Sequence, residues 1–278
     1  MLKDITLGQY FPGNSAIHNI DARVKIILSM FYLGIIFAIN NFYGYGLLVV
    51  FTLSIIFIST VPISFVLKGI RPLIFFIILT AILNVFMTSG TVWKSFGIFV
   101  ITYEGINYAV FMVLRIVFLV LGTSMLTYTT SPIELTDGLE HLLKPFKKIG
   151  LPSHELAMMM TIALRFVPTL LEETDKIMKA QTARGADFES GNIVTRAKAL
   201  IPLLIPLFIS AFRRADELAI AMECRCYRGG DNRTRLYEPK TGIIDIIAST
   251  VIVIFAISIF MLNRLGDFLA KYCTYNSI

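Results

Sequence analysis

Five long stretches of this chain are rich in apolar residues and almost free of charge, and they predict helices that cross a membrane. A helix needs about 20 residues to cross the roughly 30 Å hydrocarbon core of a bilayer. The stretches that meet this length comfortably are 47–67, 106–130 and 243–262. The other two, 24–39 and 72–87, are shorter and must borrow flanking residues. We therefore expect an all-α, polytopic membrane protein with about five transmembrane helices.

The interval between the third and fourth spans, 93–101, has an ambiguous pattern. It either extends the exit of the third span or forms an interfacial turn. In the second case Trp93 would lie at the level of the lipid headgroups, where tryptophan is enriched.

The segment 131–240 shows a different pattern, because its apolar residues recur at three- and four-residue steps among charged ones. Such spacing is typical of amphipathic helices. Capping residues predict three helices, over 131–150, 153–185 and 192–230, each beginning at a polar cap and ending at a glycine. Prolines inside the second and third predict kinks. We therefore expect a cytoplasmic domain of three long amphipathic helices.

Three domains follow from this pattern. The first is an N-terminal membrane domain with four spans, 1–130. The second is the cytoplasmic helical domain, 131–240. The third, 241–278, contains the last transmembrane helix and a short outer tail.

Composition and charge support this organisation and predict its orientation. Of the 278 residues, 56% are hydrophobic and 16% are charged, whereas a soluble domain carries about 25% charged residues. With the N-terminus in the cytoplasm, all but four of the 25 basic residues lie in cytoplasmic segments. Because basic loops stay on the cytoplasmic side of a membrane, we expect the N-terminus inside and the C-terminus outside. The net charge of +6 thus reflects membrane sidedness and not a nucleic-acid partner.

The two longest predicted cytoplasmic helices end in the same spaced pattern, Asp-x-Ile/Leu-x-x-Ala-x-x-x-Arg, over 175–184 and 216–225. Small residues flank each arginine. Ala183 and Gly185 flank Arg184, and Cys224 and Cys226 flank Arg225. One interpretation is that each arginine only caps its helix, since a cation near a helix C-terminus meets the negative end of the macrodipole. The other is that each exposed guanidinium binds carboxylates of a partner in a bidentate manner.

Several motifs resemble those of a known family, the transmembrane T components of energy-coupling factor (ECF) transporters and the related cobalt-uptake permease subunits. The resemblance covers nearly the whole chain. It is densest in 129–135, in 164–170 followed by Glu172 and Glu173, and in 180–185, which contains an Ala-Arg-Gly coupling motif. Cys224-Arg225-Cys226 is similar to a second such motif, although its cysteines depart from the commoner Ala and Gly. The element His18-x-x-Asp21-Ala22-Arg23-x-Lys25 is similar to one that usually has Pro at the position of Ala22.

The resemblance implies a subunit of an ATP-driven importer of micronutrients, either vitamins or transition metals, in the cell membrane of a prokaryote. It implies that Arg184 and Arg225 sit at the tips of coupling helices, in grooves of two ABC-type ATPase subunits. It also implies that the apolar faces of these helices hold a substrate-binding integral membrane subunit. The chain itself would then be a non-catalytic scaffold that binds no cofactor.

Other candidate sites are weaker. The chain has no Gly-x-x-x-x-Gly-Lys-[Ser/Thr] loop, so we expect it not to bind ATP phosphates in that mode. Cys224 and Cys226 point about 200° apart on a helix and make a poor metal clamp. Arg115, inside a predicted span, either has a functional role or contacts polar groups of a neighbouring helix. Arg165 and Glu172 lie on one helix face and bind either each other or the adjacent helix.

The alternative function is a stand-alone secondary transporter or channel. Such a protein needs ionisable residues or broken helices inside its spans. Only Arg115 and, less clearly, Asn84 and Asp245 meet that requirement.

Overall fold

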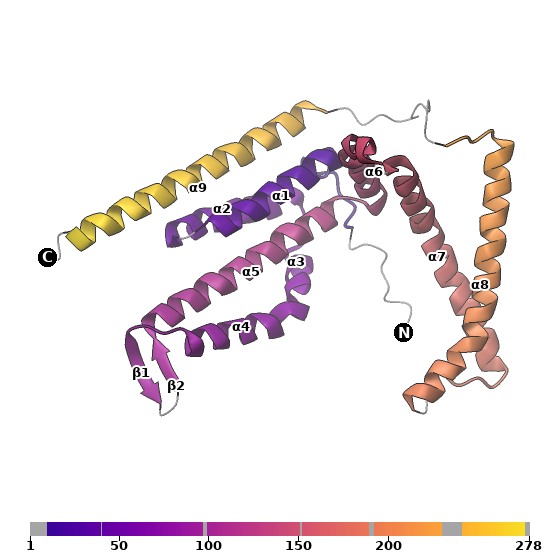
Figure 1. Ribbon diagram of the computed structural model, residues 1–278, viewed down its shortest axis with the longest axis horizontal. Helices are drawn as coiled ribbons and strands as arrows, with labels where there is room; N and C mark the ends of the chain where they lie inside the picture. The colour runs from indigo at the N-terminus through magenta and orange to yellow at the C-terminus, as the bar shows by residue number, and fades with distance from the viewer. Residues whose placement is uncertain are drawn as a thin grey trace. The chain divides into compact units, whose positions relative to one another are not determined.

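The computed structural model of this chain describes residues 10–39, 41–96, 99–150, 152–188, 192–229 and 241–275. Its helices are α1 (Ala22–Ala38), α2 (Phe42–Ser59), α3 (Ile63–Ile70), α4 (Ile74–Met87), α5 (Tyr103–Thr129), α6 (Pro132–Leu143), α7 (Ser153–Ala183), α8 (Ile193–Cys224) and α9 (Ile243–Tyr275) (Figure 1). Among the described residues there are also two 3-10 turns, η2 (Arg71–Leu73) and η3 (Lys144–Ile149), and two strands, β1 (Val92–Phe96) and β2 (Phe99–Thr102). The fold is therefore all-helical, as predicted, apart from a short hairpin.

Five described segments are long and apolar enough to span a membrane, which agrees with the expected number. They are Phe42–Ser59, Ile63–Met87, Tyr103–Thr129, Ser153–Ala183 and Ile243–Leu265. The predicted span 24–39 is not among them. It lies in α1, whose 17 residues extend only about 26 Å at 1.5 Å per residue. By length and composition α7 qualifies instead, although the sequence pattern predicts that it lies in the cytoplasm.

The predicted break between the spans 47–67 and 72–87 is in the wrong place, because the structure breaks at 60–62 and not at 68–71. α2 ends at Ser59, because Thr60 adopts a left-handed backbone (φ 57°) and Pro62 is extended. Helical structure then continues without a gap through α3, η2 and α4, from Ile63 to Met87. The run 47–67 is uncharged throughout, and Pro62 near its end was the local sign of this break.

The ambiguous interval 93–101 forms an antiparallel hairpin, in which Val92 lies opposite Thr102 and Phe96 lies opposite Phe99. It joins α4 to α5. The half-exposed Trp93 lies beside Tyr103, with 5.9 Å between their ring centroids. An aromatic pair at this end of two apolar helices is typical of the membrane–water interface.

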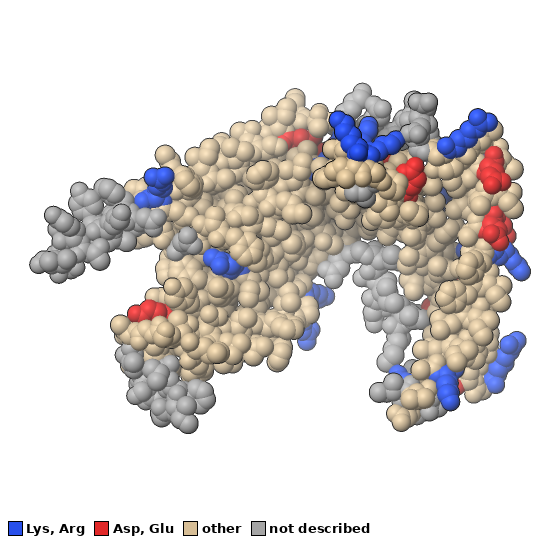
Figure 2. Space-filling model, in the orientation of Figure 1, with Lys and Arg blue, Asp and Glu red and all other residues tan. Residues whose placement is uncertain are grey.

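The described residues form two compact units, one built around α1 to α5 and α9, the other around α7 and α8. In the first unit, α1 packs against α5 and α9, and α2 packs against the same two helices. Their buried residues form one apolar cluster: Tyr32, Ile35, Ile36, Ile39, Tyr45, Leu48, Phe118, Phe255 and Ile259. The surface of these helices is almost entirely uncharged in the view of Figure 2, as expected for a surface in lipid.

In the second unit α7 and α8 pack against each other and run in opposite directions (Figure 1). α7 continues as one helix through Pro168. α8 changes direction in its first half (Figure 1), where Pro202 and Pro206 each lack the backbone N–H of a regular helix. The first predicted helix of this region, 131–150, is shorter than expected, because α6 ends at Leu143 and tightens into η3.

We predict that Gly122 is required for close packing of α5 on α1. A Cβ atom at Gly122 would meet the ring of the buried Tyr32. Gly122→Ala should therefore lower the stability of the folded chain by about 1–3 kcal/mol, the usual cost of overpacking. Thermal unfolding in detergent measures this change.

Gly34→Ala is the matched control, because nothing lies within 4 Å of a Cβ atom at that position on α1. We expect it to leave the melting temperature unchanged or to raise it. Equal melting temperatures for Gly122→Ala and the unmodified chain would contradict the packing described here.

Candidate functional site

The end of α7 has a defined hydrogen-bonding pattern around Arg184. The N–H of Gly185 donates to the carbonyl of Thr182 at 2.9 Å, and the N–H of Ala186 donates to that of Gln181 at 3.0 Å. Gly185 has a positive φ of 87°. These features define a Schellman motif, in which a left-handed residue turns the chain back over the last helical turn. Arg184 is the residue that caps the helix.

The end of α8 repeats this motif at Arg225. The N–H of Cys226 donates to the carbonyl of Glu223 at 2.9 Å, and the N–H of Tyr227 donates to that of Met222 at 3.0 Å. Cys226 has a positive φ of 57°. The prediction that this helix extends to 229–230 is therefore wrong, because the cap already ends α8 at Cys224.

The two predicted arginine sites are thus equivalent in backbone as well as in sequence. In each, a small residue precedes the arginine and a left-handed residue follows it. Glycine suits the following position because it lacks a Cβ atom, which explains the Ala-Arg-Gly sequence at Arg184. Cysteine at the corresponding position after Arg225 adopts the same conformation at a cost of roughly 1–2 kcal/mol. All six motif residues, 183–185 and 224–226, are exposed.

The two tips lie at opposite ends of the antiparallel α7–α8 pair (Figure 1). The structure therefore does not bring Arg184 and Arg225 together into one site. Each presents an exposed guanidinium beside the carbonyl end of a helix. A planar guanidinium in this position can bind a partner's carboxylate through two parallel hydrogen bonds.

An ion pair joins the two long helices between their tips. Nη2 of Arg214 on α8 lies 2.8 Å from a carboxylate oxygen of Glu173 on α7, and both side chains are partly exposed. The predicted partners Arg165 and Glu172 are both exposed, and no ion pair joins them in the described part of α7. Seven residues separate them, about 10.5 Å along a helix axis, which explains why they do not meet. Glu173 thus contacts the adjacent helix.

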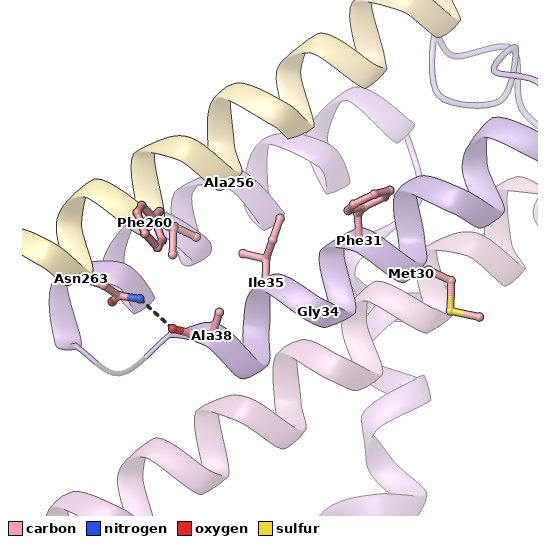
Figure 3. A pocket seen from close by; sticks show the side chains of 9 residues that line it. Met30, Phe31, Gly34, Ile35, Ala38, Ala256, Phe260 and Asn263 are labelled. Atoms are coloured by element: carbon pink, nitrogen blue, oxygen red, sulfur yellow. Dashed lines mark hydrogen bonds between the residues drawn. The ribbon is translucent and has the colours of Figure 1, made fainter.

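Arg115 binds the end of a neighbouring helix. Its Nη2 donates to the carbonyl of Ile39, just beyond α1, at 3.3 Å, and its guanidinium lies 5.7 Å from the centre of the Phe37 ring. The preceding carbonyl, that of Ala38, accepts a hydrogen bond from Nδ2 of Asn263 on α9 at 2.7 Å (Figure 3). These bonds satisfy the carbonyls that a helix leaves unpaired at its C-terminus. Of the two interpretations of Arg115, the structure favours the contact with a neighbouring helix.

Asn263 also borders a pocket of about 420 Å³ between α1 and α9 (Figure 3). The other labelled side chains around this pocket are apolar and come from the same two helices. The pocket therefore offers no set of groups for chemistry.

The N-terminal element 18–25 forms a polar cluster. The buried Lys25 donates from Nζ to the carbonyls of His18 at 3.1 Å and Thr129 at 2.8 Å. Asp21 caps α1 and binds Arg23 through both carboxylate oxygens. The hydrogen bonds and charge of Asp21 raise the pKa of Arg23.

Sequence reasoning missed the partner of this element on α9. The buried Asp245 accepts a hydrogen bond from the N–H of Asp21 at 2.9 Å, and another from the N–H of Gly242 at 2.7 Å. The sequence does show that Asp245 is a carboxylate in the first turn of an otherwise apolar helix. Such a group needs hydrogen-bond donors when it is buried, so its position was a signal that it has a partner. One of these donors, the N–H of Asp21, lies 224 residues away along the chain, and no local pattern indicates such a contact.

Comparison with known proteins finds one family model and a set of similar proteins that agree with each other. The CbiQ family, described as cobalt transport protein, matches residues 13–236. Similar proteins named energy-coupling factor transporter transmembrane protein EcfT occur in several bacteria. The protein of Clostridium kluyveri is 60% identical over 255 residues, which cover 90% of this chain and 93% of that protein. The protein of Bacillus subtilis is 47% identical over 263 residues, which cover 94% of this chain and 99% of that protein.

We predict that Cys226→Gly stabilises the chain. Glycine removes the steric cost of the left-handed conformation, although it also has more freedom to lose on folding. The net gain should be about 0.5–1 kcal/mol, measured by thermal unfolding in detergent. Cys224→Gly is the matched control, because the same substitution inside the last turn of α8 should destabilise by roughly 0.5–1 kcal/mol. A loss of stability in both variants would show that the cap at Arg225 is not formed.

Proposed function

Since this chain belongs to the EcfT transmembrane proteins of energy-coupling factor transporters, within the CbiQ cobalt transport protein family, we propose that it is the scaffold of an ATP-driven importer of vitamins or transition metals. It is a non-catalytic, multi-pass membrane subunit of bacterial type. In the proposed role it transmits the motion of two ABC-type ATPase subunits to a substrate-binding integral membrane subunit.

The observation that carries this proposal is the repeated cap at the two helix ends. Arg184 and Arg225 occupy the same position in two Schellman motifs, and both side chains are exposed. Two equivalent tips at opposite ends of a helix pair suit two equivalent partners better than one. We propose that each guanidinium docks in an acidic groove of one ATPase subunit, with the small residues on either side allowing close approach.

The packing of α7 on α8 supports a mechanical link between the tips. The helices have 31 and 32 residues, about 46–48 Å each at 1.5 Å per residue. The Arg214–Glu173 ion pair and the packed faces join them between their ends. A displacement of one tip would therefore move the other helix as well.

The partner in the membrane would cover the apolar side of α8. Large apolar side chains there are more than half exposed: Ile205 55%, Phe208 61%, Ile209 57% and Phe212 68%. Their three- and four-residue spacing puts them on one helix face, where an amphipathic helix meets a partner. We propose that this face holds the substrate-binding subunit, in a cytoplasmic domain formed by 131–240.

No observation favours the alternative of a stand-alone transporter or channel. Its main support was the charge of Arg115 inside a predicted span. That guanidinium donates to the carbonyl of Ile39 at the end of α1, and this contact supports a structural role for Arg115.

We predict that the coupling arginines are required for binding of the ATPases. Removing an arginine from a desolvated ion pair costs about 2–5 kcal/mol, which corresponds to roughly 30-fold to several-thousand-fold weaker docking. Arg184→Ala and Arg225→Ala should each weaken the recovery of ATPase subunits in a pull-down, and the double variant should do so most. Arg→Lys should restore binding only in part, because an ammonium cannot form the bidentate contact.

Arg213→Ala is the matched control, since Arg213 is an exposed arginine in the middle of α8, away from both ends of the helix pair. It should leave ATPase recovery unchanged. If the arginines act only as helix caps, the tip variants will lower the melting temperature of the isolated chain and assemble normally. Full recovery of the ATPases and coupled uptake by the double variant would refute the proposed docking.

We also predict the orientation of the chain from its basic residues, with the N-terminus in the cytoplasm. Cys224 and Cys226 are exposed, so they should react with a membrane-impermeant maleimide only after cells are permeabilised. Cys273, beyond the predicted end of the last span, should react in intact cells. Single-cysteine variants separate the two signals. The opposite labelling pattern would reverse the proposed topology.

A further inference from the structure

The 3-10 turn η3 exposes every one of its residues, although two of them are large and apolar. Its sequence is Lys-Pro-Phe-Lys-Lys-Ile, from Lys144 to Ile149. The side chain of Phe146 is 46% exposed and that of Ile149 is 79% exposed. The proposed contacts with ATPases and a membrane subunit, on α7 and α8, do not use this segment.

The geometry of a 3-10 helix sorts these residues into separate rows. With three residues per turn, positions i and i+3 lie directly above each other. Phe146 and Ile149 therefore form one apolar row. Lys144 and Lys147 form the row on one side of it, and Lys148 belongs to the row on the other side. The result is an apolar ridge flanked by cations.

The turn is held in this shape at both ends. Pro145 lies in its first turn, where it fixes φ without losing a needed hydrogen bond. Gly150 ends it with a left-handed φ of 92°, and its N–H donates to the carbonyl of Lys147 at 3.1 Å. The ridge is thus an ordered feature of the surface.

The chain enters this turn directly from the membrane bundle. α6 begins at Pro132, three residues after α5 ends at Thr129. Within α6, a Cβ atom at Gly138 would lie 3.2 Å from Ala22 and 3.2 Å from Ile26, in the first turns of α1. Six residues separate Gly138 from Lys144, about 9 Å along a helix. The covalent chain therefore allows the ridge to extend only a few residues from Gly138, which packs on the first turns of α1.

We propose that η3 is an interfacial anchor that binds anionic phospholipids, with Phe146 and Ile149 inserted among the lipids and the flanking lysines at their phosphates. Lysine stems can lie along an apolar surface while the ammonium stays with the headgroups. Basic side chains gather over α6 and the turn that follows it in Figure 2. An acidic protein would satisfy the lysines but would leave the apolar ridge in water, whereas an anionic membrane surface satisfies both. The proposal does not depend on the identity of the protein partners.

The test uses the full-length chain in vesicles of phosphatidylcholine with increasing fractions of phosphatidylglycerol. Trp93 is the sole tryptophan of the sequence, so Trp93→Phe with Phe146→Trp leaves one reporter on the ridge. We expect its emission to shift to the blue and to be quenched by brominated lipids, more strongly as the anionic fraction rises and less strongly in high salt.

Neutralising the flanking charges should weaken this docking. A lysine near an anionic surface contributes about 1 kcal/mol, or roughly fivefold at 1.4 kcal/mol per tenfold. Lys144→Gln with Lys148→Gln should therefore lower the equilibrium constant for insertion of the ridge into the lipid by roughly 25-fold. Lys176→Gln with Lys179→Gln is the matched control, because both lysines are exposed on α7, and it should change nothing.

Three results would overturn the proposal. The first is water-like, unquenched emission at every anionic fraction. The second is equal quenching in vesicles with and without phosphatidylglycerol. The third is a blue shift that requires added ATPase subunits, which would assign the ridge to a protein partner. Unchanged melting temperatures of the variants would show that their effects do not arise from unfolding.

Discussion

The burial of the Lys25 ammonium is the constraint on which the arrangement of the membrane bundle depends. A buried charge is costly unless it is paired or hydrogen-bonded, and Lys25 meets this requirement with the carbonyls of His18 and Thr129. These bonds bring the N-terminal turn, the start of α1 and the end of α5 to one place. Asp245 adds the start of α9 through its bond to the Asp21 backbone. Four segments far apart in the sequence therefore converge on one small set of polar groups.

A similar arrangement fixes the other end of α1. Arg115 from α5 and Asn263 from α9 bind the carbonyls of Ile39 and Ala38. Between the two polar ends lies the apolar cluster that includes Ile36, Leu48 and Ile259. Packing among apolar helices in lipid gains little from the hydrophobic effect. Hydrogen bonds of this kind therefore do much to determine where the helices lie relative to one another. α1 is thus held at both ends by side chains and backbone groups of α5 and α9.

Features that depend on local sequence were predicted well. The N-cap of α6 is one example, since Ser131 and Glu134 exchange hydrogen bonds at 3.1 and 3.3 Å as a capping box. The repeated arginine pattern is another, because equal spacing reflects equal caps.

Features that depend on backbone breaks inside uniformly apolar sequence were missed, as at Thr60. Partners distant in the sequence, such as Asp21 and Asp245, were missed because no pattern in a single sequence records such a contact. The helix α7 is apolar enough for a span by length and composition, yet it carries charged residues from Glu172 onward, so composition alone does not assign it to the membrane or to the cytoplasm.

The difference between the two caps has a mechanical consequence. Both end a long helix with the same two hydrogen bonds, but one uses glycine and the other uses cysteine at the left-handed position. The second turn stores conformational energy that the first does not. When force is applied along the pair, the last turn of α8 will unravel at a lower load than that of α7. The two otherwise equivalent ends therefore differ in stability, and under an equal load the end of α8 unfolds first.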